Sequence, residues 1–271
     1  MSESDPPGIP TPPVVTPPGW ARTPAREALS VWAGLVAVLA VASVTIGLVP
    51  YGKAVVGALA VGLFLWVPGW VNDRVGRDEP DGLDSTRWGP DALFALVVML
   101  LVFPAFTAGF RAFLWANDHV VPAEIARYLS PYGVSAKFTW RLPDRLLDVV
   151  GGNIAVAVGE EFFYRGWLTK RLETAWPVRT RLFGDPFGKA HVVATALFAA
   201  GHLLRPDAFR LATFFPGLLF AWMASRSGRL GGPIIVHACS NMLIATLEAS
   251  AFGHLRAPEP ASSSWFPALL P

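Results

Sequence analysis

The chain has 271 residues, of which 53% are hydrophobic and 15% are charged, and its formal net charge is +2. Soluble domains carry about 25% charged residues, so this composition excludes an ordinary soluble domain and indicates an integral membrane protein. The basic residues form no block that is typical of a nucleic-acid site, and we expect no nucleic-acid partner. Cys239 is the one cysteine, so the chain cannot form an intramolecular disulfide.

Both ends of the sequence differ in composition from its middle. Residues 1–28 are rich in proline and begin acidic, without the basic-then-apolar order of a secretory signal. We expect a disordered, partly polyproline II tail there, and a second loose tail over residues 253–271. The region between them, 29–252, is predicted to form one membrane-embedded domain.

The middle of the chain contains apolar segments of the length that a membrane-spanning helix needs, about 20 residues. The fold class is therefore all-α, a polytopic membrane helical bundle of about seven helices. A connection at 115–144 is long enough to hold an eighth. Lysine and arginine are more numerous in the loops on the side of the N-terminus, which favours a cytoplasmic N-terminus. The predicted spans are 29–49, 54–71, 91–114, 145–168, 190–204, 209–223 and 233–251.

The fourth segment carries the run Val156-Ala-Val-Gly-Glu-Glu-Phe-Phe-Tyr-Arg165. A carboxylate at membrane depth costs about 2.5 kcal/mol or more, so such residues usually mark function. Glu161 and Arg165 are four residues apart and can neutralise each other on one helix face. Glu160 points about 140° away from Arg165 and needs partners from other helices. This asymmetry suits a catalytic base beside a structural ion pair.

Two further motifs follow, Phe198-x-x-x-His202 in the fifth segment and His237-x-x-x-Asn241 in the seventh. Residues four apart lie on one helix face, about 6 Å along the axis, so three helices can direct these side chains and Glu160 at one point. Amide hydrolysis needs a base that activates water and donors for the developing oxyanion. We expect Glu160 to be the base, His202 to orient the water, and His237 and Asn241 to stabilise the oxyanion.

The same residue types also occur in catalytic zinc sites, where Glu160, His202 and His237 would be the ligands. The spacing is not that of an H-E-x-x-H helix, and the two histidines come from separate segments. Spacing therefore leaves both mechanisms open. We favour the glutamic mechanism, which requires no cofactor, with a divalent metal such as zinc as the alternative.

The three motifs, in this order and each in an apolar segment, resemble the CAAX-protease and bacteriocin-processing superfamily of intramembrane proteases, which includes the type II CAAX prenyl endopeptidases. The resemblance covers residues 148–248. It implies a helical membrane bundle, Glu160 as catalytic base with Glu161 and Arg165 in support, and a membrane-anchored protein substrate cleaved during sorting or maturation. Members are often labelled metalloproteases.

Two other function classes remain open at this stage. Buried glutamate and histidine also serve proton-coupled transporters, although the sequence has no inverted repeat. A non-catalytic membrane scaffold or immunity factor is the third class. The composition, rich in alanine, arginine and proline, is typical of a bacterial chain, so we expect a multi-pass protein of the bacterial cytoplasmic (inner) membrane. The oligomeric state is left open.

Overall fold

The computed structural model describes residues 19–21, 23–46, 49–77, 87–122, 124–125, 137–144, 146–204 and 208–252. Residues 1–18 of the tail predicted over 1–28, and the whole of the tail predicted over 253–271, lie outside the described residues. The described chain is almost entirely helical, which confirms the all-α membrane bundle. Its elements are α1 (Pro24–Thr45), α2 (Gly52–Arg74), α3 (Trp88–His119), α5 (Leu146–Glu161), the π-helix η3 (Phe162–Leu168), α6 (Thr169–Ala175), the strands β1 (Arg181–Leu182) and β2 (Asp185–Pro186), α7 (Lys189–Gly201), α8 (Phe214–Ser227), α9 (Gly231–Phe252), and the short 3-10 helices η1 (Gly19–Ala21), η4 (His202–Leu204) and η5 (Ala208–Thr213).

Each of the seven predicted spans falls on a helix. Four helices of the described chain, α1, α2, α3 and α9, are long and apolar enough to cross a membrane by themselves. The number of spans stays a prediction, because α7 and α8 are shorter. Helix α3 exceeds its predicted span at both ends, since its terminal turns carry polar residues that a hydropathy window leaves out.

Helix α1 begins earlier than predicted. Pro24 occupies the first helical turn, and the Thr23 hydroxyl accepts a hydrogen bond from the Arg26 N–H at 3.3 Å. Proline and an N-cap threonine are both favourable at a helix start, so they begin the helix before its apolar run does. The predicted limit of the tail at residue 28 is therefore too late, and residues 24–28 are helical.

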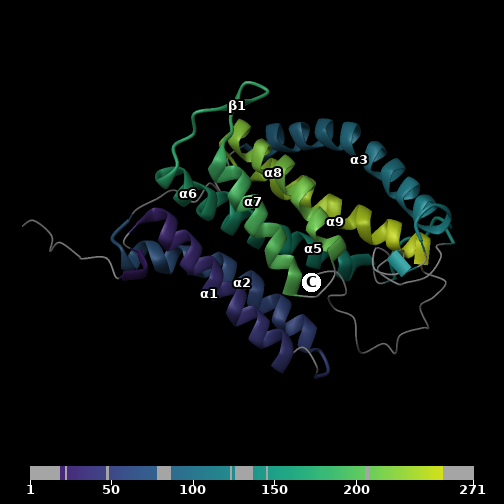
Figure 1. Ribbon diagram of the computed structural model, residues 1–271, viewed down its shortest axis with the longest axis horizontal. Helices are drawn as coiled ribbons and strands as arrows, with labels where there is room; N and C mark the ends of the chain where they lie inside the picture. Colours follow the sequence, from purple (N-terminus) through teal and green to yellow (C-terminus); the bar gives the residue numbers. More distant parts are fainter. Residues whose placement is uncertain are drawn as a thin grey trace, which may run out of the picture.

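Helix α5 occupies the middle of the bundle. It packs against α2 on one side and α9 on the other, while α7 packs against α8 and α3 against α9. Figure 1 shows α1 and α2 together on one flank and α3 arching over the other. The approach of α5 to α2 depends on Gly159, because a Cβ there would lie 3.3 Å from the Val61 Cα. The fold thus surrounds the glutamate-bearing helix with other helices.

Ion pairs tie several helices together at the end of the bundle that holds the α6–α7 and α8–α9 connections. Asp91, at the start of α3, accepts hydrogen bonds from Arg229, the shortest at 2.6 Å from Nη2 to Oδ1. Glu27 of α1 pairs with Arg77, which follows α2, and with Arg171 of α6 at 3.2 Å. Both acids are buried. Helices distant in the sequence are thereby fixed to one another.

The basic connection between α6 and α7 contains a feature that the sequence did not predict, a short β-hairpin. Strands β1 and β2 are antiparallel, with Leu182 opposite Asp185, so Phe183 and Gly184 form a two-residue turn. The Asp185 carboxylate accepts hydrogen bonds from Trp222 Nε1 at 3.1 Å and from Arg226 Nη1 at 2.8 Å. These contacts fix the hairpin to α8.

Candidate active site

Glu160 and Glu161 are the last residues of α5, where the α-helix passes directly into the π-helix η3. Every residue of η3 is buried. Its last turn is closed by Thr169, whose N–H and Oγ1 both donate to the Tyr164 carbonyl, the hydroxyl at 2.7 Å. Short π-helical turns occur frequently at functional sites. The backbone is therefore irregular directly beside the paired acids.

The predicted ion pair is present. Arg165 Nη1 lies 2.9 Å from Glu161 Oε1, and both side chains are buried. Arg165 Nη2 donates to the carbonyl of Gly217 on α8 at 3.0 Å. The guanidinium also lies over the rings of Phe198 and Phe220, at 4.6 and 5.5 Å from their centroids, where cation–π attraction stabilises it. Arg165 thus connects the glutamate helix to α8.

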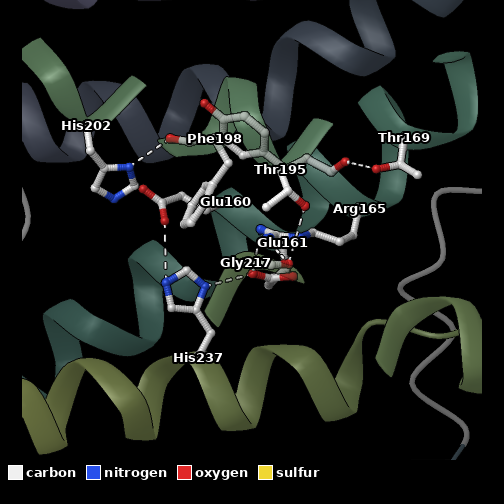
Figure 2. Close-up of polar contacts among 10 residues, drawn as sticks. Glu160, Glu161, Arg165, Thr169, Thr195, Phe198, His202, Gly217 and His237 are labelled. Atoms are coloured by element: carbon white, nitrogen blue, oxygen red, sulfur yellow. Dashed lines mark hydrogen bonds and ion pairs between the residues drawn. The ribbon is translucent and has the colours of Figure 1, made fainter. Parts of the chain in front are cut away.

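His237 lies between the two glutamates. Its Nδ1 is 2.7 Å from Glu161 Oε1, and its Nε2 is 3.5 Å from Glu160 Oε2. Glu161 Oε1 accepts from Arg165 and from Nδ1 of His237, which leaves Nε2 facing Glu160. Figure 2 shows this arrangement, and Phe220 stacks on the imidazole at 4.8 Å. The contact between His237 and Glu161 was not predicted.

His202, the first residue of η4, approaches Glu160 from the end of α7. Its Nδ1 lies 2.8 Å from the Phe198 carbonyl, so this nitrogen donates and Nε2 remains for the site. His202 interacts electrostatically with both Glu160 and His237. In Figure 2 the Glu160 carboxylate lies between the two imidazole rings. The Phe198 ring packs edge-on against His202, with centroids 4.7 Å apart.

Asn241 lies one helical turn after His237 on α9 and is half-buried. The hydrogen bonds and ion pairs of the described residues connect Glu160, Glu161, Arg165 and His237, and Asn241 is not among the residues that they connect. Its role at the oxyanion therefore stays a prediction.

The alternative with a metal ion has no preformed ligand cluster in the part of the chain that the structure describes. Within it, no three histidine, cysteine, aspartate or glutamate side chains are close enough together to hold a metal ion. Both ring nitrogens of His237 face carboxylates, and Nδ1 of His202 is hydrogen-bonded to the Phe198 carbonyl. Ligation by Glu160, His202 and His237 therefore also stays a prediction.

Sequence reasoning missed Gly217, which completes the environment of Arg165. A Cβ at this position would lie 2.9 Å from Thr195 Cγ2 and 3.2 Å from Arg165 Nη2. The Gly217 carbonyl also lies 3.5 Å from the Thr195 hydroxyl. Only glycine allows α8 to approach the guanidinium this closely. The Pro216-Gly217 pair near the start of an apolar helix was the sequence signal that could have indicated this close approach.

Residues 142–243 match the family described as type II CAAX prenyl endopeptidase Rce1-like. The match covers the segment that carries the three motifs and supports the predicted resemblance to the CAAX-protease superfamily. The matched segment contains Glu160, Glu161, Arg165, His202, His237 and Asn241. Comparison with curated proteins found no match, and neither did comparison with solved structures. The match supports a CAAX-protease-like intramembrane endopeptidase, and the long apolar helices agree with an integral membrane protein.

Proposed function

We propose that this endopeptidase cleaves a peptide bond near the membrane-tethered end of an anchored protein, and that Glu160 activates the attacking water. The observation that carries the proposal is the position of the Glu160 carboxylate between His202 and His237 inside an apolar bundle. The Glu160 side chain is 16% exposed, whereas Glu161 is fully buried. Water can therefore reach Glu160, while Glu161 serves as the buried ion-pair partner.

The reaction follows from these groups. Glu160 accepts a proton from water as the water oxygen attacks the scissile carbonyl carbon, and a tetrahedral oxyanion forms. Glu160 then returns the proton to the departing amide nitrogen, and the C–N bond breaks. His202, held by the Phe198 carbonyl, presents Nε2 to orient the water. Atoms and protons balance without a further reactant.

Stabilisation of the oxyanion is assigned to His237 and Asn241. Because Nδ1 of His237 is directed at Glu161, only Nε2 can face the substrate, and it donates when the ring carries both protons. Asn241 adds an amide N–H from the same helix. Donors fixed in this way before the reaction stabilise the charge that develops in the transition state. The Glu161–Arg165 pair sets the orientation of His237 and acts as a positioning group.

The substrate class follows from the family and from the membrane setting. A site within an apolar bundle favours a protein whose anchor segment lies in the same bilayer, as in C-terminal sorting or maturation. We place the enzyme in the bacterial cytoplasmic membrane with its N-terminus in the cytoplasm. This orientation is supported by the excess of loop lysine and arginine on that side.

The test compares wild type with Glu160→Gln by membrane proteomics in the native host, at matched protein levels. Asp118→Asn is the control, because this exposed acid lies at the end of α3, far along the chain from the motifs. We expect a set of membrane proteins to keep their anchor segments only in Glu160→Gln. An unchanged proteome, together with an unchanged phenotype, would contradict the proposal and favour a scaffold or transporter.

A further inference from the structure

The β1–β2 hairpin has a residue at its turn that the turn geometry does not favour. Phe183 has φ of 52° and Gly184 has φ of 90°. A two-residue hairpin turn with both φ values positive favours Asn-Gly, because asparagine tolerates the left-handed region. A bulky aromatic residue adopts that region rarely and at a conformational cost. The turn therefore does not explain why phenylalanine occupies position 183.

Internal packing does not explain it either. The Phe183 ring meets the edge of Trp222, with centroids 6.0 Å apart, yet Phe183 is 82% exposed. Strained residues persist where the surrounding structure holds them and where they serve a function. The surrounding structure does hold this turn. Asp185 accepts hydrogen bonds from two side chains of α8, and Arg181 Nη1 donates to the Gly184 carbonyl at 2.7 Å.

The position of the hairpin beside α8 indicates which part of the membrane surrounds the exposed Phe183 ring. Trp222 lies five residues before the last residue of α8, about 7.5 Å inside the helix end. The Phe183 ring, in contact with Trp222, therefore lies beside the apolar helix α8 near its end. Figure 1 shows the hairpin at the end of the bundle, next to α8. Because the sequence predicts α8 as a membrane span, we expect this end of the helix to lie at the level of the lipid headgroups.

The charges around the turn suit an anionic surface. Arg181 is exposed in β1, Arg179 is exposed two residues before it, and Lys189 is exposed at the start of α7. The acid of the hairpin, Asp185, is already paired with Arg226. Aromatic rings are enriched at the headgroup level, and basic residues there are attracted to anionic lipids.

We propose that the β1–β2 hairpin is a membrane-interface anchor, in which Phe183 inserts into the headgroup region and Arg179 and Arg181 bind anionic lipid headgroups. This inference does not depend on the proposed catalytic mechanism. It assigns the lipid-facing role to a segment between two helices of the catalytic motifs, and it fixes the depth of that end of the bundle in the bilayer.

The first experiment measures the depth of the turn directly. The full chain, with Cys239→Ala to remove the native thiol, carries a nitroxide at Phe183→Cys in nanodiscs of phosphatidylcholine with or without phosphatidylglycerol. Accessibility to oxygen and to a water-soluble nickel chelate is read by power saturation. The reference label is at Thr174→Cys, an exposed position of α6 outside the hairpin.

We expect the label at 183 to collide several-fold less with the chelate than the reference does, and to lie deeper when phosphatidylglycerol is present. The pair Arg179→Gln and Arg181→Gln should remove that lipid-dependent shift. Equal chelate access at 183 and 174 in both lipids would overturn the proposal. The same depth in both lipids would overturn the assignment of anionic lipid. If the label at 183 were protected from the chelate only in native membranes, the ring would contact a protein partner instead of the bilayer, which would overturn the proposal.

A second variant separates anchoring from folding. Phe183→Asn places the favoured residue in the turn, so the melting temperature in detergent should stay equal or rise. In nanodiscs with phosphatidylglycerol, the variant should lose part of the stabilisation that wild type gains on transfer from detergent. A lower melting temperature in detergent as well would show that Phe183 has only a structural role and would overturn the proposal.

Discussion

The two adjacent glutamates are expected to respond in opposite ways to the same substitution. Oε1 of Glu161 accepts hydrogen bonds from Arg165 and His237. In Glu161→Gln, the amide oxygen can take its position, so the substitution removes the negative charge and keeps the shape of the side chain. Arg165, itself buried, then lacks its carboxylate. Breaking a buried ion pair by removing one partner costs about 3–5 kcal/mol. At about 2–4 °C per kcal/mol, the melting temperature should fall by roughly 6–20 °C.

Glu160→Gln should instead leave the melting temperature close to that of wild type, because the Glu160 side chain is partly exposed and its Oε2 lies 3.5 Å from His237 Nε2, a longer contact than those of Glu161. Its activity should fall about 10²–10⁴-fold, the usual contribution of a general base. Both effects are measurable on purified protein in detergent, by thermal unfolding and by cleavage of an anchored peptide.

A double variant supplies the control for the first effect. Glu161→Gln combined with Arg165→Met removes both charges, so it should be less destabilised than the sum of the two single variants. The reasoning would be refuted if Glu161→Gln melted as high as Glu160→Gln, or if the double variant showed simple additivity. Either result would mean that Arg165 does not depend on Glu161 for its neutralisation.

Three more predictions concern positions around the site. Gly217→Ala should destabilise by about 1–3 kcal/mol through overpacking and should lower activity. Gly151→Ala is its matched control, because a Cβ there has no atom within 4 Å and should stabilise by about 0.5–1 kcal/mol in a helix interior. Asp91→Asn should lower unfolding free energy by about 1.5–3 kcal/mol by weakening the bonds to Arg229, with kcat unchanged at low temperature. Chelation by phenanthroline should leave cleavage intact; loss of activity restored by zinc would contradict the glutamic mechanism.

The part of the site that the sequence predicted is local along one helix. Glu161 and Arg165 are four residues apart, and helix geometry alone brings them together. The contact of His237 with Glu161 spans 76 positions, and that of Arg165 with Gly217 spans 52. Such contacts depend on how helices are rotated against each other, which a single sequence does not specify.

The fold was predictable to a similar extent. Long apolar runs located the longer helices of the described chain, α1, α2, α3, α5, α7, α8 and α9, because a membrane span requires about 20 apolar residues. The π-helix η3 was not predicted, since a π-turn leaves the apolar composition unchanged. The hairpin was missed because its strands have two residues each and its turn is Phe-Gly, which lacks the usual Asn-Gly signal.

The early start of α1 determines how much of the N-terminus the membrane domain needs. A truncation at residue 29, where the apolar run begins, would delete the Thr23 cap, worth about 1 kcal/mol. It would also delete Glu27, and the positive charges of Arg77 and Arg171 would lose that buried acid. Arg171 lies in α6, which continues from η3 and so connects to the helix of the paired glutamates. The minimal folded protein therefore begins at or before Thr23, and shorter versions should lose stability.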